Sequence, residues 1–161
     1  MNDLSRTAPD GKRPATGIGA IRGLGYVFIL CDDIDSMKRF YQNLFQFYIE
    51  EETPGRMVEF RVGPGLLGLR TRGRTYDGPA LPEKAASVQL SFRVPPSDVD
   101  AAFETLKPMN IEVIEPPTNQ DWPHRTLYFK DPENNIVEIF ADIHTRETKP
   151  EPSGIHALVA G

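Results

Sequence analysis

The chain has few of the residues that would cross-link it, hold it in a membrane or bind it to nucleic acid. Its single cysteine, Cys31, cannot form an internal disulfide. No apolar run is long enough to span a bilayer, and the first residues lack the charged and apolar segments of a secretion signal. The 18 Lys and Arg are outnumbered by 23 Asp and Glu, and the net charge of −5 does not favour phosphate backbones. We therefore expect a cytoplasmic protein with no nucleic-acid or membrane partner.

Proline, in contrast, is in excess, with 15 of 161 residues against a usual share of about 5%. Four prolines lie in two stretches without apolar periodicity, which we interpret as a disordered leader, residues 1–20, and a C-terminal tail, residues 144–161. The others fall between the helices and strands predicted below, where a missing backbone N–H does no harm. A single ordered domain is thus expected at residues 21–143.

An internal repeat organises this domain. The segment GYVFILCDDIDSMKRFYQNL, residues 25–44, has a counterpart in SVQLSFRVPPSDVDAAFETL, residues 87–106, and each is typical of an alternating strand that leads into a helix. Asp33 or Asp35 can cap the first helix and Ser97 the second. Both helices have one apolar stripe with the spacing i, i+3, i+4, i+7, made of Met37, Phe40, Tyr41 and Leu44 in the first and of Val99, Ala102, Phe103 and Leu106 in the second.

Three further strands are predicted after each helix, separated by turn signals such as GPG and DPENN. They cover residues 47–51, 57–62 and 66–71 in the first copy, and 111–115, 125–130 and 136–142 in the second. Each copy is thus a βαβββ module, the first at about residues 21–74 and the second at about 87–143, with a linker at about 75–86. Because one helix covers only one face of a four-stranded sheet, we expect an α+β fold whose open sheet faces form a U-shaped, partly closed trough, with the helices outside.

This organisation resembles the vicinal oxygen chelate superfamily, which includes glyoxalases, bleomycin resistance proteins and extradiol dioxygenases. The resemblance covers residues 21–143 and rests on the repeat, on Phe40 and Tyr41 in the first helix, and on DPENNIVEIF at residues 131–140. It implies a divalent metal in the trough, held by a His, Gln or Glu on the first strand of each copy and by a Glu on the last strand.

The residues that match these ligand positions are Tyr26, Gln89 and Glu138, and the first-copy counterpart of Glu138 is Leu69 or Arg70. Zinc and ferrous iron prefer imidazole or thiolate, so a phenol, an amide and a carboxylate fit a tightly bound metal poorly. A hard divalent cation could bind weakly through Gln89 and Glu138, with His124 or Tyr26 as a further ligand.

Strand alternation predicts which side chains line the trough, because the aliphatic side chains of each strand should face the helix. The remaining side chains are mostly aromatic with a few polar groups, which is typical of a small-molecule site. The expected ligand-binding residues are Tyr26, Phe28, Gln89, Ser91, Arg93, Trp122, His124, Tyr128 and Phe140.

Glu138 is the candidate catalytic residue, as a base or as a metal ligand. A buried carboxylate needs a partner, and we expect Arg93 or Arg125 to supply it, although Arg93 could instead hold an anionic group of a ligand. The cluster of Arg70, Arg72 and Arg74 is interpreted as a solvated strand end.

Two functions remain open, beside a third reading in which the protein is a regulatory or structural relic whose trough is filled by its own side chains. The first is a protein that binds a small aromatic or amphipathic molecule, as the bleomycin resistance proteins do, and whose metal site at Tyr26, Gln89 and Glu138 is degenerate. The alternative is a metal-dependent lyase, isomerase or dioxygenase of the glyoxalase kind, with Gln89 and Glu138 as ligands. In either case we expect a homodimer, because members of the superfamily pair their modules within one chain or across two.

Overall fold

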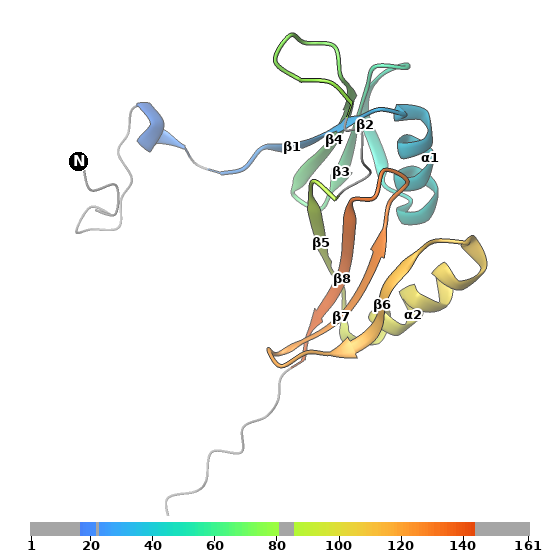
Figure 1. Ribbon diagram of the computed structural model, residues 1–161. Helices are drawn as coiled ribbons and strands as arrows, with labels where there is room; N and C mark the ends of the chain where they lie inside the picture. Colours follow the sequence, from blue (N-terminus) through green and yellow to red (C-terminus); the bar gives the residue numbers. More distant parts are fainter. Residues whose placement is uncertain (1–16, 22, 81–85, 144–161) are drawn as a thin grey trace, which may run out of the picture. The chain divides into compact units, whose positions relative to one another are not determined.

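The computed structural model describes residues 17–21, 23–80 and 86–143, and it divides into two compact units, unit 1 (residues 1–83) and unit 2 (residues 84–161). Each unit contains a four-stranded mixed sheet and one α-helix (Figure 1). The predicted α+β fold with the order βαβββ in each half is thus confirmed. The tail predicted after residue 143 lies outside the described residues, as does the leader except for a 3₁₀ turn at Gly17–Ala20.

The two units have the same topology, in which the first strand joins the last in parallel and the other pairs are antiparallel. The strand order is β1-β4-β3-β2 in unit 1 and β5-β8-β7-β6 in unit 2. Unit 1 contains the elements η1 (Gly17–Ala20), β1 (Tyr26–Cys31), α1 (Ile34–Phe45), β2 (Tyr48–Thr53), β3 (Met57–Val62) and β4 (Gly65–Thr71). Unit 2 contains the elements β5 (Gln89–Arg93), α2 (Pro96–Leu106), η2 (Lys107–Met109), β6 (Val113–Asn119), β7 (His124–Lys130) and β8 (Ile136–Asp142).

Helix α1 begins and ends where its sequence provides caps. The side chain of Asp33 accepts a hydrogen bond of 3.0 Å from the backbone N–H of Ser36, which satisfies one of the free donors of the first turn. Gln46 ends the helix with a left-handed φ of 55°. Met37 and Tyr41, from the predicted stripe, are fully buried, so these two residues of α1 belong to the core of unit 1.

Helix α2 begins differently from the prediction. Pro95 is the N-cap and makes no side-chain cap bond, whereas Pro96 occupies the first turn, a position where proline lacks only an N–H that would be free anyway. Ser97 therefore lies inside the helix, and its expected capping role is wrong. Val99 and Leu106 are buried on the inner face of α2.

Strand β6 contains two prolines that we expected in a turn. Pro116 and Pro117 lie within Val113–Asn119, and the pairing with β7 shifts register between Glu115 and Thr118. Because β6 is at the edge of its sheet and irregular at this point, it can include residues that donate no ladder hydrogen bond.

The turn between β7 and β8 is fixed by the side chain of Asp131. Its Oδ1 accepts the N–H groups of Glu133 and Asn135, at 2.9 and 3.0 Å, and its Oδ2 accepts the side-chain amide of Asn135 at 2.9 Å. Asn134 has a left-handed φ of 66°, which asparagine tolerates better than most residues. The turn thus sets the register of β8, on which Glu138 lies.

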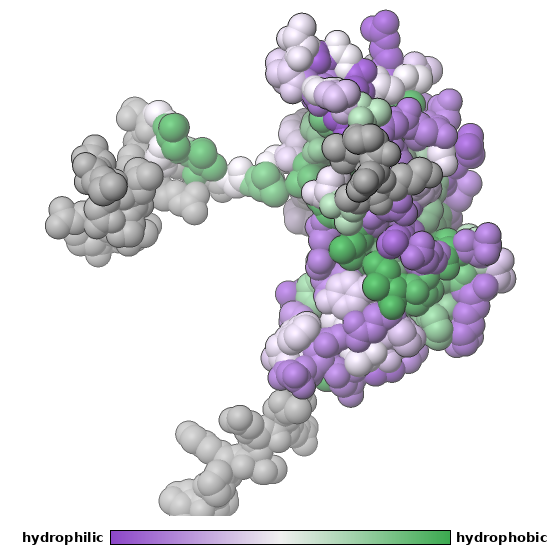
Figure 2. Space-filling model, in the orientation of Figure 1, coloured by the Kyte–Doolittle hydropathy of each residue, from purple (hydrophilic) through white to green (hydrophobic). Residues whose placement is uncertain are grey.

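The surface combines hydrophilic residues with hydrophobic patches (Figure 2). Ile18 and Leu24, before β1, are 88% and 81% exposed. No described helix is long and apolar enough to cross a membrane.

Candidate functional site

The sheet face of unit 2 opposite α2 carries a nearly buried carboxylate. Glu138 is only 7% exposed. Its Oε2 accepts hydrogen bonds from the hydroxyl of Ser91 and, at 3.3 Å, from the amide of Gln89. Its Oε1 accepts a bond of 2.8 Å from the hydroxyl of Tyr128. All three donors are neutral groups.

Strand register explains why these side chains meet. In the parallel pair of β5 and β8, Ser91 lies opposite Glu138, and in the antiparallel pair of β7 and β8, Tyr128 lies opposite Glu138. The three residues therefore form one row across three strands. Gln89 joins them because it lies two residues before Ser91 and so shares its face.

The environment keeps Tyr128 protonated. Burial, then the hydrogen bond to Glu138 and its negative charge, raise the pKa of Tyr128 to about 12. A phenol with that pKa donates its proton in a hydrogen bond at neutral pH rather than carrying a negative charge. Tyr128 thus acts as a donor to the carboxylate of Glu138.

The predicted cationic partner of Glu138 is wrong. Arg93 pairs with Asp142 on the same face, and its guanidinium lies 5.0 Å from the ring centre of Phe140. Arg125 points to the other face, where it binds Asp100 of α2 in a two-pronged contact at 2.7 and 2.8 Å. The odd and even positions of β7 explain this, because Arg125 alternates with the residues of the open face.

A second group of side chains lies further along the same face of β8. His124 is 3.1 Å from Asp142, and its ring lies 4.9 Å from that of Phe140. Trp122, in the turn before β7, is 48% exposed. Sequence reasoning missed Asp142, although it alternates with Glu138 and Phe140 and the same argument that placed those two predicts its face.

Thr126 belongs to this face, as strand alternation predicts, and Gln120, which was not predicted, joins it. Thr126 is fully buried, and its hydroxyl accepts a hydrogen bond of 2.8 Å from the amide of Gln120. The same amide donates to Glu115 at 3.1 Å. These residues form a polar network beside the row of Glu138.

Tyr26 and Phe28 lie on the corresponding face of unit 1, where their rings stack with centres 5.7 Å apart. Phe28 pairs with Gly68 of β4, and Gly68 pairs with Glu59 of β3. The row Phe28, Gly68 and Glu59 thus matches the row of Glu138 in unit 2. The counterpart of Glu138 is therefore Gly68, and the expected Leu69 or Arg70 is wrong by one or two residues.

The donor atoms around Glu138 do not fit a tightly bound transition metal. One carboxylate, an amide and two hydroxyls, of which the Tyr128 phenol stays protonated, lack the imidazole and thiolate groups that such ions select. Within residues 17–21, 23–80 and 86–143, no three His, Cys, Asp or Glu side chains group as a metal site would require. Tyr26, at the remaining predicted ligand position, would add only another phenol.

Comparison with known proteins identifies the family. The model of the Glyoxalase/Bleomycin resistance protein/Dioxygenase superfamily matches residues 23–139, and the chain belongs to this superfamily. The resemblance inferred from the repeat and the DPENN turn is thus confirmed.

Individual relatives agree with this assignment. The chain is 28% identical over 123 residues to the glyoxalase domain-containing protein RDO1 of Mycosarcoma maydis, covering 74% of this chain and 68% of that protein. A glyoxalase/bleomycin resistance protein/dioxygenase from Nocardioides has the same fold, with a TM-score of 0.66, 24% identity, and coverage of 83% of this chain and 91% of that one. The structure of a lactoylglutathione lyase from Agrobacterium tumefaciens matches with a TM-score of 0.61 at 20% identity. The match covers 74% of this chain and 92% of that one.

Proposed function

We propose that the open face of unit 2 binds a small aromatic or amphipathic organic molecule, and that Glu138 accepts a hydrogen bond from a hydroxyl or ammonium group of that ligand. No tightly held transition metal takes part. The carrying observation is the carboxylate of Glu138, nearly buried and bonded to three neutral donors. A carboxylate has about four lone-pair sites, so a ligand donor can use one that the protein leaves open.

The surroundings of Glu138 suit the apolar part of such a ligand. Phe140 lies two residues further along β8 on the same face, and His124 lies beside its ring. Trp122 exposes about half of its surface, and an exposed indole near the site can stack on a planar molecule. Together these rings supply apolar contact area, while the hydrogen bond to Glu138 orients the ligand.

The fluorescence of Trp122 tests this proposal, because it is the chain's only tryptophan. Phenethylamine and catechol carry the ammonium and hydroxyl donors, and toluene is the control without a donor. We expect the first two to change the emission with saturation, and Glu138→Gln to weaken their binding about tenfold, the loss of a charge-assisted hydrogen bond. Glu112→Gln, an exposed residue paired with Lys130, is the matched control. Equal binding to the Glu138→Gln variant would overturn the proposal.

The metal-dependent lyase, isomerase or dioxygenase remains the competing function. The metal content of the purified protein distinguishes it from the metal-free binding protein. Elemental analysis after purification without a tag or chelator should find no stoichiometric transition metal. A bound metal that is lost in the Glu138→Gln variant would instead support the alternative, with Gln89 and Glu138 as ligands. A homodimer is part of our proposal, and light scattering at several concentrations measures it directly.

A further inference from the structure

Unit 1 contains a pocket that is lined in part by a nearly buried carboxyl group. Its volume is about 730 Å³, and the residues that line it all belong to unit 1. Phe28 of β1 and Met57 and Glu59 of β3 line it from the sheet, together with residues 70–74 at the end of β4 and Arg56 in the turn before β3. The charged and apolar groups of this pocket can therefore be described within one unit.

Glu59 is a buried carboxyl group without a hydrogen-bond donor. It lies in the row of Phe28 and Gly68, which corresponds to the row of Glu138 in unit 2. Glu59 is only 8% exposed, and among the residues that the structure describes none donates a hydrogen bond to its side chain or forms an ion pair with it. Glu138, in contrast, has three donors. Because a buried carboxyl group without a partner is unfavourable, a donor from a ligand would stabilise Glu59.

The charges nearest to Glu59 are negative. Glu51 of β2 lies directly opposite Glu59, and like charges in opposite positions repel each other. Burial, then the charges of Glu51 and Glu50, raise the pKa of Glu59. Arg61, two residues further along β3, is bound to Glu50 at 3.0 Å. A positively charged group in the pocket would therefore be attracted to Glu59.

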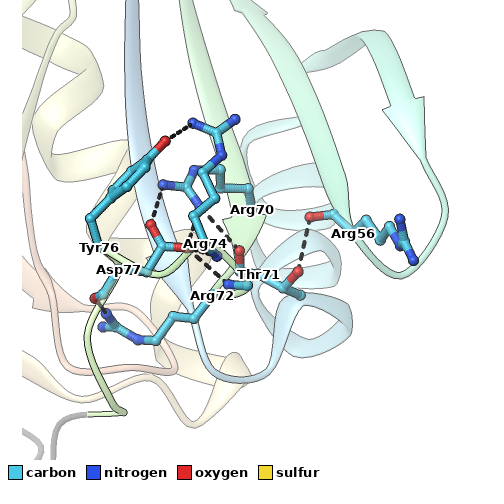
Figure 3. A network of polar contacts seen from close by, with 8 residues as sticks. Arg56, Arg70, Thr71, Arg72, Arg74, Tyr76 and Asp77 are labelled. Atoms are coloured by element: carbon cyan, nitrogen blue, oxygen red, sulfur yellow. Dashed lines mark hydrogen bonds and ion pairs between the residues drawn. The ribbon is translucent and has the colours of Figure 1, made fainter.

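Two of the arginines that line the pocket are bound to carboxylates. Arg70 binds both oxygens of Asp77, at 2.7 and 2.8 Å (Figure 3), and Arg72 binds Asp32 at 3.0 Å. The side chains of Arg70 and Arg72 are only 17% and 21% exposed, so their interpretation as part of a solvated strand end is wrong. The hydrogen bonds from Arg70, followed by those from two backbone N–H groups, hold the pKa of Asp77 far below its usual value. Asp77 therefore stays ionised at neutral pH and compensates the charge of Arg70.

The other two arginines do not converge on one point. Arg74 donates a hydrogen bond of 2.9 Å to the hydroxyl of Tyr76. Figure 3 shows the side chain of Arg56 pointing away from that of Arg74 and from Asp77. The arginines therefore do not form a joint site for an anion, and the nearly buried carboxyl of Glu59 is the stronger candidate for contact with a ligand.

Phe28 and Met57 supply an apolar surface beside Glu59. The ring of Phe28 is 39% exposed and occupies the place above Gly68, which separates it from Glu59 in the row. Met57 comes two residues before Glu59 on β3 and so shares its face. An aromatic ring also attracts a cation. An apolar lining with a single directed acceptor is typical of a site for a small organic molecule.

We propose that this pocket binds a small organic amine, whose ammonium group donates a hydrogen bond to the carboxylate of Glu59 and whose apolar part packs on Phe28 and Met57. An ammonium group supplies the two things that Glu59 lacks, a hydrogen-bond donor and a positive charge. A hard metal ion fits less well, because it prefers more oxygen ligands than the side chains of Glu59 and Glu51 provide.

Methyl NMR of the full chain, labelled at its methionines, tests whether the pocket binds an amine. Met57 is one of four methionines, and its signal is identified by its absence in the Met57→Leu variant. Benzylamine carries the ammonium group, benzyl alcohol is the neutral analogue and benzoate the anionic one. We expect benzylamine to shift the Met57 signal with a dissociation constant of about 1 mM or below, and the other two to bind at least about tenfold more weakly. No shift at about ten times that concentration of benzylamine, or tighter binding of either analogue, would overturn the proposal.

Variants assign the binding to Glu59. Glu59→Gln should weaken benzylamine about tenfold, whereas Glu59→Asp keeps the charge and should weaken it less. Glu52→Gln is the matched control, because Glu52 lies on the other face of the same sheet, where it binds Lys38 of α1. Circular dichroism checks that each variant is folded. Unchanged binding in Glu59→Gln, or an equal loss in Glu52→Gln, would contradict the role of Glu59.

The Glu138→Gln variant distinguishes this site from the function proposed for unit 2. If only Glu138→Gln weakens the effect of benzylamine, the amine site at Glu59 is wrong, but the proposed function of Glu138 is not. A tenfold weakening in Glu59→Gln supports the amine site, with or without an effect of Glu138→Gln.

Discussion

The ring of Phe28 occupies the place above Gly68 that a side chain would otherwise fill. An added Cβ at Gly68 would lie 2.3 Å from two atoms of that ring, far inside van der Waals contact. In the matching row of unit 2 this position holds Glu138, and the partner from the first strand is the small Ser91. In unit 1 the large residue of this pair, Phe28, is on the first strand, whereas in unit 2 the large residue, Glu138, is on the last strand.

Replacing this glycine tests the exchange. We expect Gly68→Ala to displace the Phe28 ring rather than to disrupt the sheet, because the ring is partly exposed and can turn away. The free energy of unfolding should fall by only about 1 kcal/mol. Denaturant titration measures this loss. A loss above about 3 kcal/mol would show instead that the ring cannot move.

Tyr128 should titrate at unusually high pH. Its pKa of about 12 means that its phenol remains protonated near pH 11, when exposed tyrosines are ionised. The Tyr128→Phe variant should therefore lose absorbance change at 295 nm only in the highest part of the titration. The raised pKa contributes stability that is complete below about pH 10 and declines between about pH 10 and 12. A titration of Tyr128→Phe that differs from the parent protein near pH 10 would contradict this environment.

Glu59 should make the protein less stable as the pH rises. Its pKa is raised mainly by burial and then by Glu51 and Glu50. A carboxyl with a raised pKa stabilises the fold fully below its ordinary value of 4.5, and this contribution is lost as the pH passes through the raised pKa. The Glu59→Gln variant should therefore be more stable than the parent protein at pH 7 and lose less stability between pH 4 and 7.

Urea titrations across this pH range measure the effect of Glu59. Glu51→Gln is a useful comparison, because it removes one of the charges that raise the pKa and should act in the same direction but more weakly. Parallel stability profiles for the parent protein and the Glu59→Gln variant would contradict the predicted pKa.

Asp131 should be among the most important polar residues for stability. Replacing it with alanine leaves the N–H groups of Glu133 and Asn135 and the side-chain amide of Asn135 without their acceptor, and Asp131 and Asn135 are buried. We expect a loss of about 3 kcal/mol in the free energy of unfolding. Asp121→Ala, in an exposed turn, is the control, and a similar loss there would contradict the role of the Asp131 turn.

Much of the fold could be predicted because its elements are local. The stripe of Met37 and Tyr41 and the alternation of β8 depend only on neighbours in sequence, and the repeat then supplied the topology. The row of Ser91, Tyr128 and Glu138 was placed on one face for the same reason, although which atoms bond to Glu138 required the register.

The wrong predictions concern contacts that depend on how neighbouring strands are aligned with one another. Arg93 pairs with Asp142 instead of Glu138, because its long side chain can reach along the sheet face to a more distant partner. The counterpart of Glu138 is Gly68 instead of Leu69 or Arg70, because turn lengths alone do not determine which residues of two strands pair. The ion pair of Arg70 and Asp77 was missed because Asp77 binds Arg70 from outside every predicted strand. A spacing of seven residues between these two gives no signal in the sequence.

The two prolines of β6 also restrict how copies of this chain can associate. An edge strand usually offers a row of free N–H groups that another strand can join, which is the first step of both sheet-extended dimers and amyloid-like stacking. Pro116 and Pro117 have no N–H to donate, and because successive N–H groups of a strand point to opposite sides, one of the two removes a donor from that free row. The register shift beside them interrupts the regular pairing of the strand. Self-association of this protein should therefore proceed through surfaces other than the β6 edge. We do not expect the sheet of unit 2 to be extended by a strand added beside β6.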